Sequence, residues 1–154
     1  MTSGKRSPSG TTGADIFQHC VMTRARQISR VLTATYDQAL RPFGINATQF
    51  TLLVLVHELG PISRADLGRR NHHDRSTLTR NLQPLLTEGW IAEDVAEAAD
   101  GRSRPLSVTR AGKLVLKDAG PAWAEAQAIA TTLIGADGVT AIMGIAGKLP
   151  RRHG

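Results

Sequence analysis

The spacing of apolar residues along the chain predicts a largely helical protein. Over residues 15–41, apolar side chains recur on one helical face, and Pro42 follows the last turn. A single helix of that length extends about 40 Å. Because so small a domain does not cover such a helix by itself, we expect it to pack on a partner subunit. A second helix is predicted over 46–59, opened by a capping box of Asn46 and Gln49.

The middle of the chain changes from long periodic stretches to short ones. The pattern predicts a helix at 63–70, a polar turn at 71–73, a helix at 74–88, and short strands at 90–92 and 106–108. Helix, turn, helix and β-hairpin in this order form a winged helix-turn-helix, a DNA-binding motif.

The second helix of this motif carries the side chains suited to reading DNA. Asp74 is positioned to cap its N-terminus, and leucines at helical spacing give it one apolar face. Arginine and small hydroxyl side chains on the other faces suit base edges and phosphates in the major groove. The candidate DNA-binding residues of the whole motif are Ser63, Arg64, Asp74, Arg75, Ser76, Thr77, Thr79, Arg80, Arg102 and Arg104.

The wing combines a basic tip with an acidic arm. At the tip, Asp100 is expected to pair with one of Arg102 and Arg104, which leaves the other arginine for the minor groove. Glu93 and Asp94 belong to the acidic arm, which we expect to face away from DNA or to be repelled by it.

Two further helices are predicted after the wing, at 109–132 and 137–149, with a kink at Gly120-Pro121. The chain is therefore expected to be mainly α, a winged helix-turn-helix with long flanking helices that form a dimerisation region. The predicted divisions are a disordered tail at 1–13, one domain at 14–150, dimerisation helices at 14–45 and 110–150, and a DNA-binding lobe at 46–109. A two-fold homodimer would place two recognition helices about one DNA turn apart.

Composition narrows the choice of partners. The net charge of +6 and the pI near 10.4 favour a polyanion such as double-stranded DNA. No run of 18 apolar residues occurs, so no membrane span is expected. The single cysteine fits a reducing, cytoplasmic compartment. The sequence has no glycine-rich phosphate loop, no metal-ligand spacing and no nucleophile with evident partners, so we expect neither an enzyme, nor a bound metal, nor a cofactor.

Several motifs together resemble the MarR family of bacterial transcriptional regulators. They are the Leu-Arg-Pro-Phe-Gly-Ile run at 40–45, Thr-Gln-Phe at 48–50, the run at 74–82 with Gly89, the Asp-x-Arg pattern within 100–104, and Val-Thr at 108–109 with Gly112. The resemblance covers about residues 15–149. It implies an obligate homodimer that binds an inverted-repeat operator, most often as a repressor, and that a small phenolic ligand or cysteine oxidation releases from DNA.

Two points stay open at the level of sequence. The family usually places a glycine between two apolar residues in the turn of the motif, whereas this chain has Asn71, His72 and His73. That departure, with the acidic wing arm, motivates an alternative in which the protein has lost DNA binding and acts through protein or ligand contacts. The second point is the signal that the protein senses. If Arg24 activates the Cys20 thiol, the protein is a redox sensor. If Cys20 is instead a packing residue, the signal is a small effector that binds in a pocket between helices. The candidate effector or redox residues are Cys20, Arg24, Tyr36, His57 and Trp123.

Overall fold

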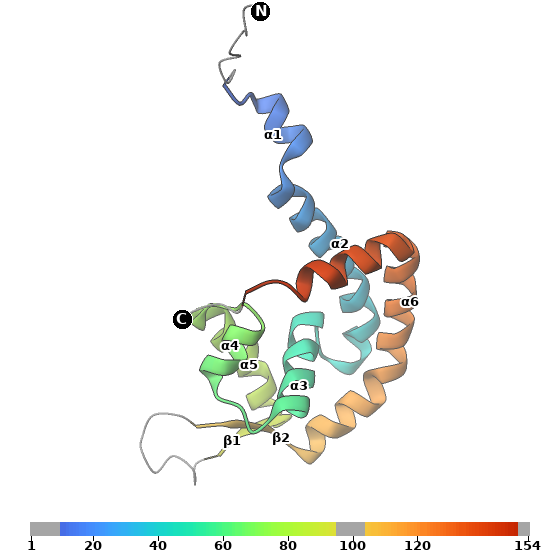
Figure 1. The fold of residues 1–154 in the computed structure, drawn as a ribbon. Helices are drawn as coiled ribbons and strands as arrows, with labels where there is room; N and C mark the ends of the chain where they lie inside the picture. The colour runs from blue at the N-terminus through green and yellow to red at the C-terminus, as the bar shows by residue number, and fades with distance from the viewer. Residues whose placement is uncertain (1–9, 95–103, 151–154) are drawn as a thin grey trace, which may run out of the picture. The chain divides into compact units, whose positions relative to one another are not determined.

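The computed structural model describes residues 10–94 and 104–150, and within these ranges the chain is mainly α-helical (Figure 1). The elements in chain order are α1 (Gly13–His19), α2 (Val21–Leu40), the 3-10 turn η1 (Arg41–Phe43), α3 (Ala47–Leu59), α4 (Arg64–Arg70), α5 (Arg75–Thr87), β1 (Ile91–Glu93), β2 (Leu106–Val108) and α6 (Arg110–Ala146). The predicted mainly α winged helix-turn-helix is confirmed. The described residues form two compact units, which divide between Leu32 and Thr33.

The single helix predicted over 15–41 is wrong, because the chain leaves the helical conformation at Cys20. This residue has φ −71° and ψ 106°, so it ends α1 while its carbonyl accepts the first bond of α2, from the Arg24 N–H at 3.2 Å. A non-helical residue whose carbonyl accepts the first bond of a helix occupies the N-cap position of that helix. Cysteine is not among the preferred N-cap types, so the sequence pattern did not show this break.

The core of the second unit is built around α3, which contacts α4, α5, α6 and β2 (Figure 1). Its side chains meet leucines of α5 and residues of the wing strands in one cluster, and burying each leucine completely contributes about 1.5–3 kcal/mol. The largest fully buried side chains are Leu40, Leu52, Leu53, Leu67, Leu82, Leu85, Ile91, Leu106 and Val56. The DNA-binding motif therefore rests on a shared apolar core.

Both ends of α3 are set by local chemistry. The predicted capping box is present, since the Asn46 side chain accepts from the Gln49 N–H at 2.8 Å and Gln49 accepts from the Asn46 N–H. The Asp37 carboxylate of α2 accepts a further bond, from the Ala47 N–H at 2.7 Å. At the other end, a Cβ on Gly60 would lie 2.4 Å from the backbone oxygen of Val56, so only glycine fits there. The position of α3 is thus fixed relative to the last turns of α2.

The wing strands pair antiparallel, with Ile91 opposite Val108 and Glu93 opposite Leu106. The predicted strands are confirmed to within one residue. Leu106 also forms a bridge with Ile62, the residue that precedes the N-cap of α4. The base of the wing is consequently hydrogen-bonded to the start of the helix-turn-helix.

The two helices predicted after the wing, at 109–132 and 137–149, are present as the two parts of α6, which meet at a kink at Gly135 (Figure 1). Gly135 has φ 70° and ψ 166°, a conformation that glycine adopts without the steric cost of a Cβ. The kink expected at Gly120-Pro121 is not where the dihedral angles leave the helix, because α6 continues through Pro121. The position of the bend therefore follows the glycine, not the proline.

By length and composition alone, α6 contains an 18-residue window that could cross a membrane, with mean hydropathy 1.6. The sequence analysis predicts no membrane-spanning segment, so this window differs from that expectation. Only 6% of this window is buried inside the chain. The helix thus carries apolar surface that the described residues do not cover.

Candidate nucleic-acid interface

The turn between α4 and α5 is formed by the three polar residues that depart from the family pattern. His72 has φ 54°, in the left-handed region that glycine adopts most easily. The His73 N–H then donates to the Gly68 backbone oxygen at 3.0 Å. Gly68 is buried beneath it, and a Cβ at this position would lie 3.3 Å from the His73 carbonyl oxygen. The motif therefore closes with a histidine in a conformation that suits glycine.

The imidazole of His73 is partly buried, and this burial lowers its pKa despite the adjacent charge of Asp74. Its ring lies against the side-chain amide of Asn71, with Nε2 at 3.4 Å. Over the described ranges, no group of three or more His, Cys, Asp or Glu side chains is close enough to hold a metal ion. The imidazole is held as part of the turn.

Asp74 caps α5, as predicted. Its carboxylate accepts from the Thr77 N–H at 2.8 Å, from the Thr77 hydroxyl at 2.9 Å and from the Ser76 hydroxyl at 2.8 Å. Three of the predicted DNA-binding residues thus form one cap, which fixes the direction of the helix and turns two hydroxyl groups toward its N-terminus.

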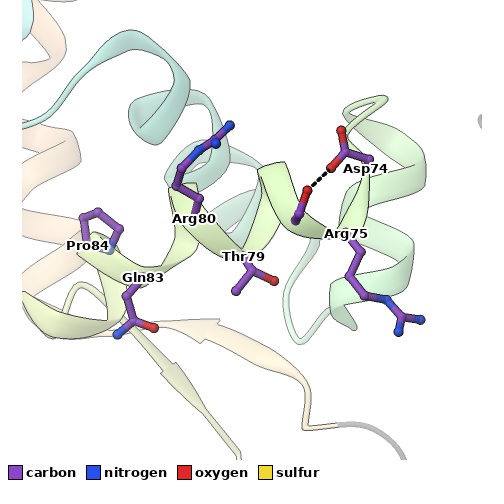
Figure 2. Close-up of a pocket in the computed structure, with 7 residues that line it drawn as sticks. Asp74, Arg75, Thr79, Arg80, Gln83 and Pro84 are labelled. Carbon is purple, nitrogen blue, oxygen red and sulfur yellow. Dashed lines mark hydrogen bonds between the residues drawn. The ribbon is translucent and has the colours of Figure 1, made fainter.

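The exposed face of α5 lies opposite its buried leucines and forms an open depression of about 1050 Å³ (Figure 2). In the close-up, Arg80 extends from one side of the helix, while Thr79 and Gln83 extend from another. Arg75 and Arg80 are exposed and make no ion pair with any described residue. The lining residues are Asp74, Arg75, Ser76, Thr79, Arg80, Gln83 and Pro84.

Gln83 is a member of this face that the sequence analysis missed. It is exposed, four residues after Thr79 and seven after Ser76, so helical spacing alone places it on the same stripe. Its amide carries both a donor and an acceptor, which suits the edge of adenine. Its spacing of four and seven residues from Thr79 and Ser76 is the sequence signal that identifies it.

Ser63 and Arg64 lie at the start of α4 and are engaged locally. The Ser63 hydroxyl accepts from the Asp66 N–H at 3.0 Å and donates to its carboxylate at 2.8 Å. The bond from the Ser63 hydroxyl to the carboxylate, followed by that from Arg69, lowers the pKa of Asp66. Arg64 pairs with the carboxylate of Glu93, an acidic residue of the wing arm that we expected to face away from DNA or to be repelled by it.

The wing tip is described only in part. Arg104 is exposed, and its Nη1 lies 3.9 Å from Oε2 of Glu93. Arg102 and Asp100 lie outside the described residues, so the expected pairing of Asp100 with an arginine at the tip stays a prediction.

Two of the predicted effector residues are brought together. The rings of Tyr36 and Trp123 lie 6.4 Å apart between centroids, and the Tyr36 hydroxyl donates to the side-chain oxygen of Gln127. Burial raises the pKa of Tyr36. His57 is not part of this cluster as described, since its side chain is exposed and faces Glu58, with 3.8 Å between Nε2 and Oε1. Gln127, which the sequence analysis did not name, is the polar partner of the aromatic pair.

Cys20 and Arg24 belong to the N-terminal unit. The pKa of the Cys20 thiol is lowered, first by hydrogen bonding to the Thr23 side chain, and the charge of Arg24 is the smallest of the causes. Arg24 donates instead to the Phe17 carbonyl at 3.1 Å and to Gln27 at 2.9 Å. The pKa of Cys20 is therefore lowered as expected, but the main cause is Thr23 and not Arg24.

A helix-turn-helix with a paired wing and an outward-facing basic recognition helix defines a winged-helix DNA-binding protein. A family model described as the MarR family matches residues 43–103. The solved structure of the M. tuberculosis transcriptional regulator MosR in complex with DNA is 31% identical, covers 83% of this chain and 94% of its own, and superposes with a TM-score of 0.71. The chain belongs to the MarR family of transcriptional regulators.

Two other relatives place the match in context. The uncharacterized HTH-type transcriptional regulator YwoH of Bacillus subtilis is 24% identical over 84 residues, which is 54% of this chain and 60% of YwoH. A Mycobacterium tuberculosis MarR family protein in complex with salicylic acid is 22% identical, covers 83% of this chain and 94% of its own, and has a TM-score of 0.62, which shows a shared fold. Members of the family are DNA-binding regulators and not enzymes, in agreement with the expectation from sequence.

Proposed function

We propose that this protein is a cytoplasmic, homodimeric repressor that binds an inverted-repeat operator and is released by a small phenolic-type effector. The observation that carries the DNA-binding part is the exposed face of α5, where Arg75 and Arg80 have no ion-pair partner among the described residues. Unpaired guanidinium groups beside exposed hydroxyl and amide side chains suit both phosphates and base edges. The DNA complex of the similar regulator MosR supports the same assignment.

Each predicted residue has a proposed role in this complex. Arg80 and Thr79 meet base edges, and Arg75 meets the backbone or a base near the start of the helix. Asp74 holds the cap through which Ser76 and Thr77 face phosphate. The remaining predicted contacts, with the DNA backbone and the minor groove, are Ser63, Arg64, Arg102 and Arg104.

Exposed apolar side chains in both units support the homodimer. In the N-terminal unit, Phe17 and Val21 are 76% and 80% exposed, and on α6 Met143 and Ile145 are 70% and 63% exposed. Large apolar side chains that one copy of the chain leaves exposed suit a subunit interface.

The effector part of the proposal starts from Tyr36, Trp123 and Gln127. They combine two aromatic faces with a polar group, which is the chemistry that small aromatic ligands use. The salicylic acid complex of the Mycobacterium tuberculosis neighbour supports a ligand of this class.

The test starts with selection of tight binders from a random duplex pool, followed by mobility shifts against a scrambled duplex of equal length. We expect an inverted repeat, with binding that weakens as salt rises, and release by millimolar salicylate. A reporter gene behind the selected operator should be expressed less when the protein is present. If no sequence is enriched and no duplex is shifted at low salt, the alternative holds, in which the protein has lost DNA binding.

A second candidate function is redox sensing through Cys20. The specific observation is that the thiol is partly exposed and has a lowered pKa, whereas a packing residue would be buried in apolar surroundings. We expect mild peroxide to release operator DNA and a reductant to restore binding, while Cys20→Ser stays bound. With one cysteine in the chain, a disulfide joins two subunits or captures a small thiol, and a non-reducing gel separates these cases. Equal responses of mutant and parent to peroxide would eliminate this function.

A further inference from the structure

Glu93 joins the wing to the helix-turn-helix through two arginines. Its Oε1 accepts from Nε of Arg64 at 3.0 Å and also from the Arg64 Nη2, while its Oε2 lies 3.9 Å from Nη1 of Arg104. The three residues come from β1, from the first turn of α4 and from the segment that leads into β2. The Glu93 carboxylate thus lies against two guanidinium groups, that of Arg64 through Oε1 and that of Arg104 through Oε2.

The backbone holds these groups in place. Leu106 and Ile62 exchange hydrogen bonds of 2.8 and 3.0 Å, and the Asp94 N–H donates to the Pro105 carbonyl at 2.9 Å. Asp94 and Pro105 are the chain neighbours of Glu93 and Arg104. Ile62 and Leu106 lie two positions from Arg64 and Arg104 along the chain. Because the surrounding backbone is paired, the carboxylate needs little reorganisation to stay between the two guanidinium groups.

Burial makes the contact with Arg64 the stronger of the two. The side chain of Glu93 is 24% exposed and that of Arg64 is 36% exposed, whereas that of Arg104 is 59% exposed. Charge-assisted bonds with two N–H groups on one oxygen are stronger than neutral hydrogen bonds. The pair with Arg104 is longer and more solvated, so salt screens it more.

We propose that Glu93 weakens DNA binding by holding Arg64 and Arg104, so that a DNA phosphate must displace its carboxylate before it can contact either arginine. The inference rests on the proposed DNA-binding function. A phosphate must compete with the Glu93 carboxylate for these guanidinium groups. Operator DNA, which docks through the face of α5, brings its phosphates close enough to bind the two guanidinium groups. Non-operator DNA is bound more loosely, so its phosphates do not displace the carboxylate. Glu93 is thus a positioning residue, acting through the arginines it holds.

The test compares Glu93→Gln with the parent protein on the selected operator and on a scrambled duplex, from about 50 to about 200 mM salt. We expect the variant to bind the scrambled duplex about tenfold more tightly, with a log–log salt slope steeper by about one to two, because each additional phosphate contact contributes about 0.9. Operator binding should tighten by at least the same factor, because its phosphates no longer have to displace the carboxylate, while the salt slope on the operator should stay unchanged. If Glu93 only stabilised the fold, its replacement would not make the salt slope on the scrambled duplex steeper.

Glu88→Gln is the matched control, because it removes the same charge from the same lobe and Glu88 makes no ion pair with the described residues. If Glu93→Gln and Glu88→Gln behave alike on the scrambled duplex, the inference is wrong. If the parent itself shows no operator preference, the proposed function fails instead. The two failures are therefore distinguishable.

A second variant does not depend on how Glu93→Gln folds. In the parent, Arg64→Ala should leave the salt slope on scrambled DNA unchanged, because Glu93 already occupies that arginine, while lowering the slope on the operator by about one. In the Glu93→Gln background, the same substitution should lower the slope on scrambled DNA as well. A lower slope for Arg64→Ala alone on scrambled DNA would overturn the inference.

Discussion

At the residue scale, His72 carries a backbone cost inside the DNA-binding motif. Its φ of 54° costs an L-residue about 1–2 kcal/mol, whereas glycine adopts this conformation freely but loses more entropy on folding. We therefore expect His72→Gly to raise the free energy of unfolding by about 0.5–1 kcal/mol, measured in urea at a fixed protein concentration.

His72→Ala is the control for this prediction. It removes the imidazole but keeps a Cβ at the same left-handed position, so it should give none of the gain. If alanine stabilises the protein as much as glycine does, the imidazole is the source of the effect and the backbone conformation is not.

Arg80 tests the face of α5 directly. The side chain is exposed and belongs to the face formed with Ser76, Thr79 and Gln83. If it contacts a base, Arg80→Ala should weaken operator binding by about 1–3 kcal/mol and relax the preference at one position of the site. Lys117→Ala removes the same charge from α6 and should change affinity much less. Equal losses in the two variants would show that net charge alone is responsible.

The residue scale is also where sequence reasoning worked best and failed most clearly. The caps by Asn46 and Asp74 were both predicted, because donor and acceptor lie within three residues of each other. The pair of Arg64 with Glu93 was not, because 29 positions separate them and only the folded wing brings them together. Local hydrogen bonds can be predicted from spacing, whereas contacts between elements need the fold.

At the scale of elements, the start of α5 depends on one carboxylate. Asp74→Ala removes the acceptor for the Thr77 N–H and for two hydroxyl groups, and losing an N-cap typically costs about 1 kcal/mol. We expect that loss in the free energy of unfolding, with weaker operator binding because the first turn of the helix is no longer held. Asp74→Asn keeps an acceptor and should lose much less stability. Equal destabilisation by the two substitutions would show that the charge matters more than the cap.

The boundaries of the long helices show what periodicity can and cannot predict. The apolar repeat continues across Cys20, so the pattern predicted one helix where the backbone forms two. On α6, a glycine marked the actual change of direction, and the proline before it did not. Periodicity reports which residues share a face, but it does not detect a single residue whose ψ angle departs from the helix.

At the scale of the whole molecule, the distribution of apolar surface is uneven. The helix-turn-helix and wing share a buried core with α3, whereas the later part of α6 exposes Leu133, Met143 and Ile145 by more than half. Exposing so much apolar area is unfavourable by roughly 25 cal/mol for every Å² that an interface would bury. This asymmetry supports a DNA-binding lobe complete in itself and a helical region that a second copy covers.

We therefore expect light scattering at micromolar concentration to give twice the 16.5 kDa mass of the chain. Ile145→Asp places a charge in the proposed interface, so it should shift the protein toward the monomer and weaken operator binding, because a monomer contacts one half-site. Leu59→Asp is the control, since Leu59 is 38% exposed at the end of α3, in the predicted DNA-binding lobe and outside the predicted dimerisation helices. A parent protein that stays at 16.5 kDa, or a control that dissociates as readily as Ile145→Asp, would contradict this interface.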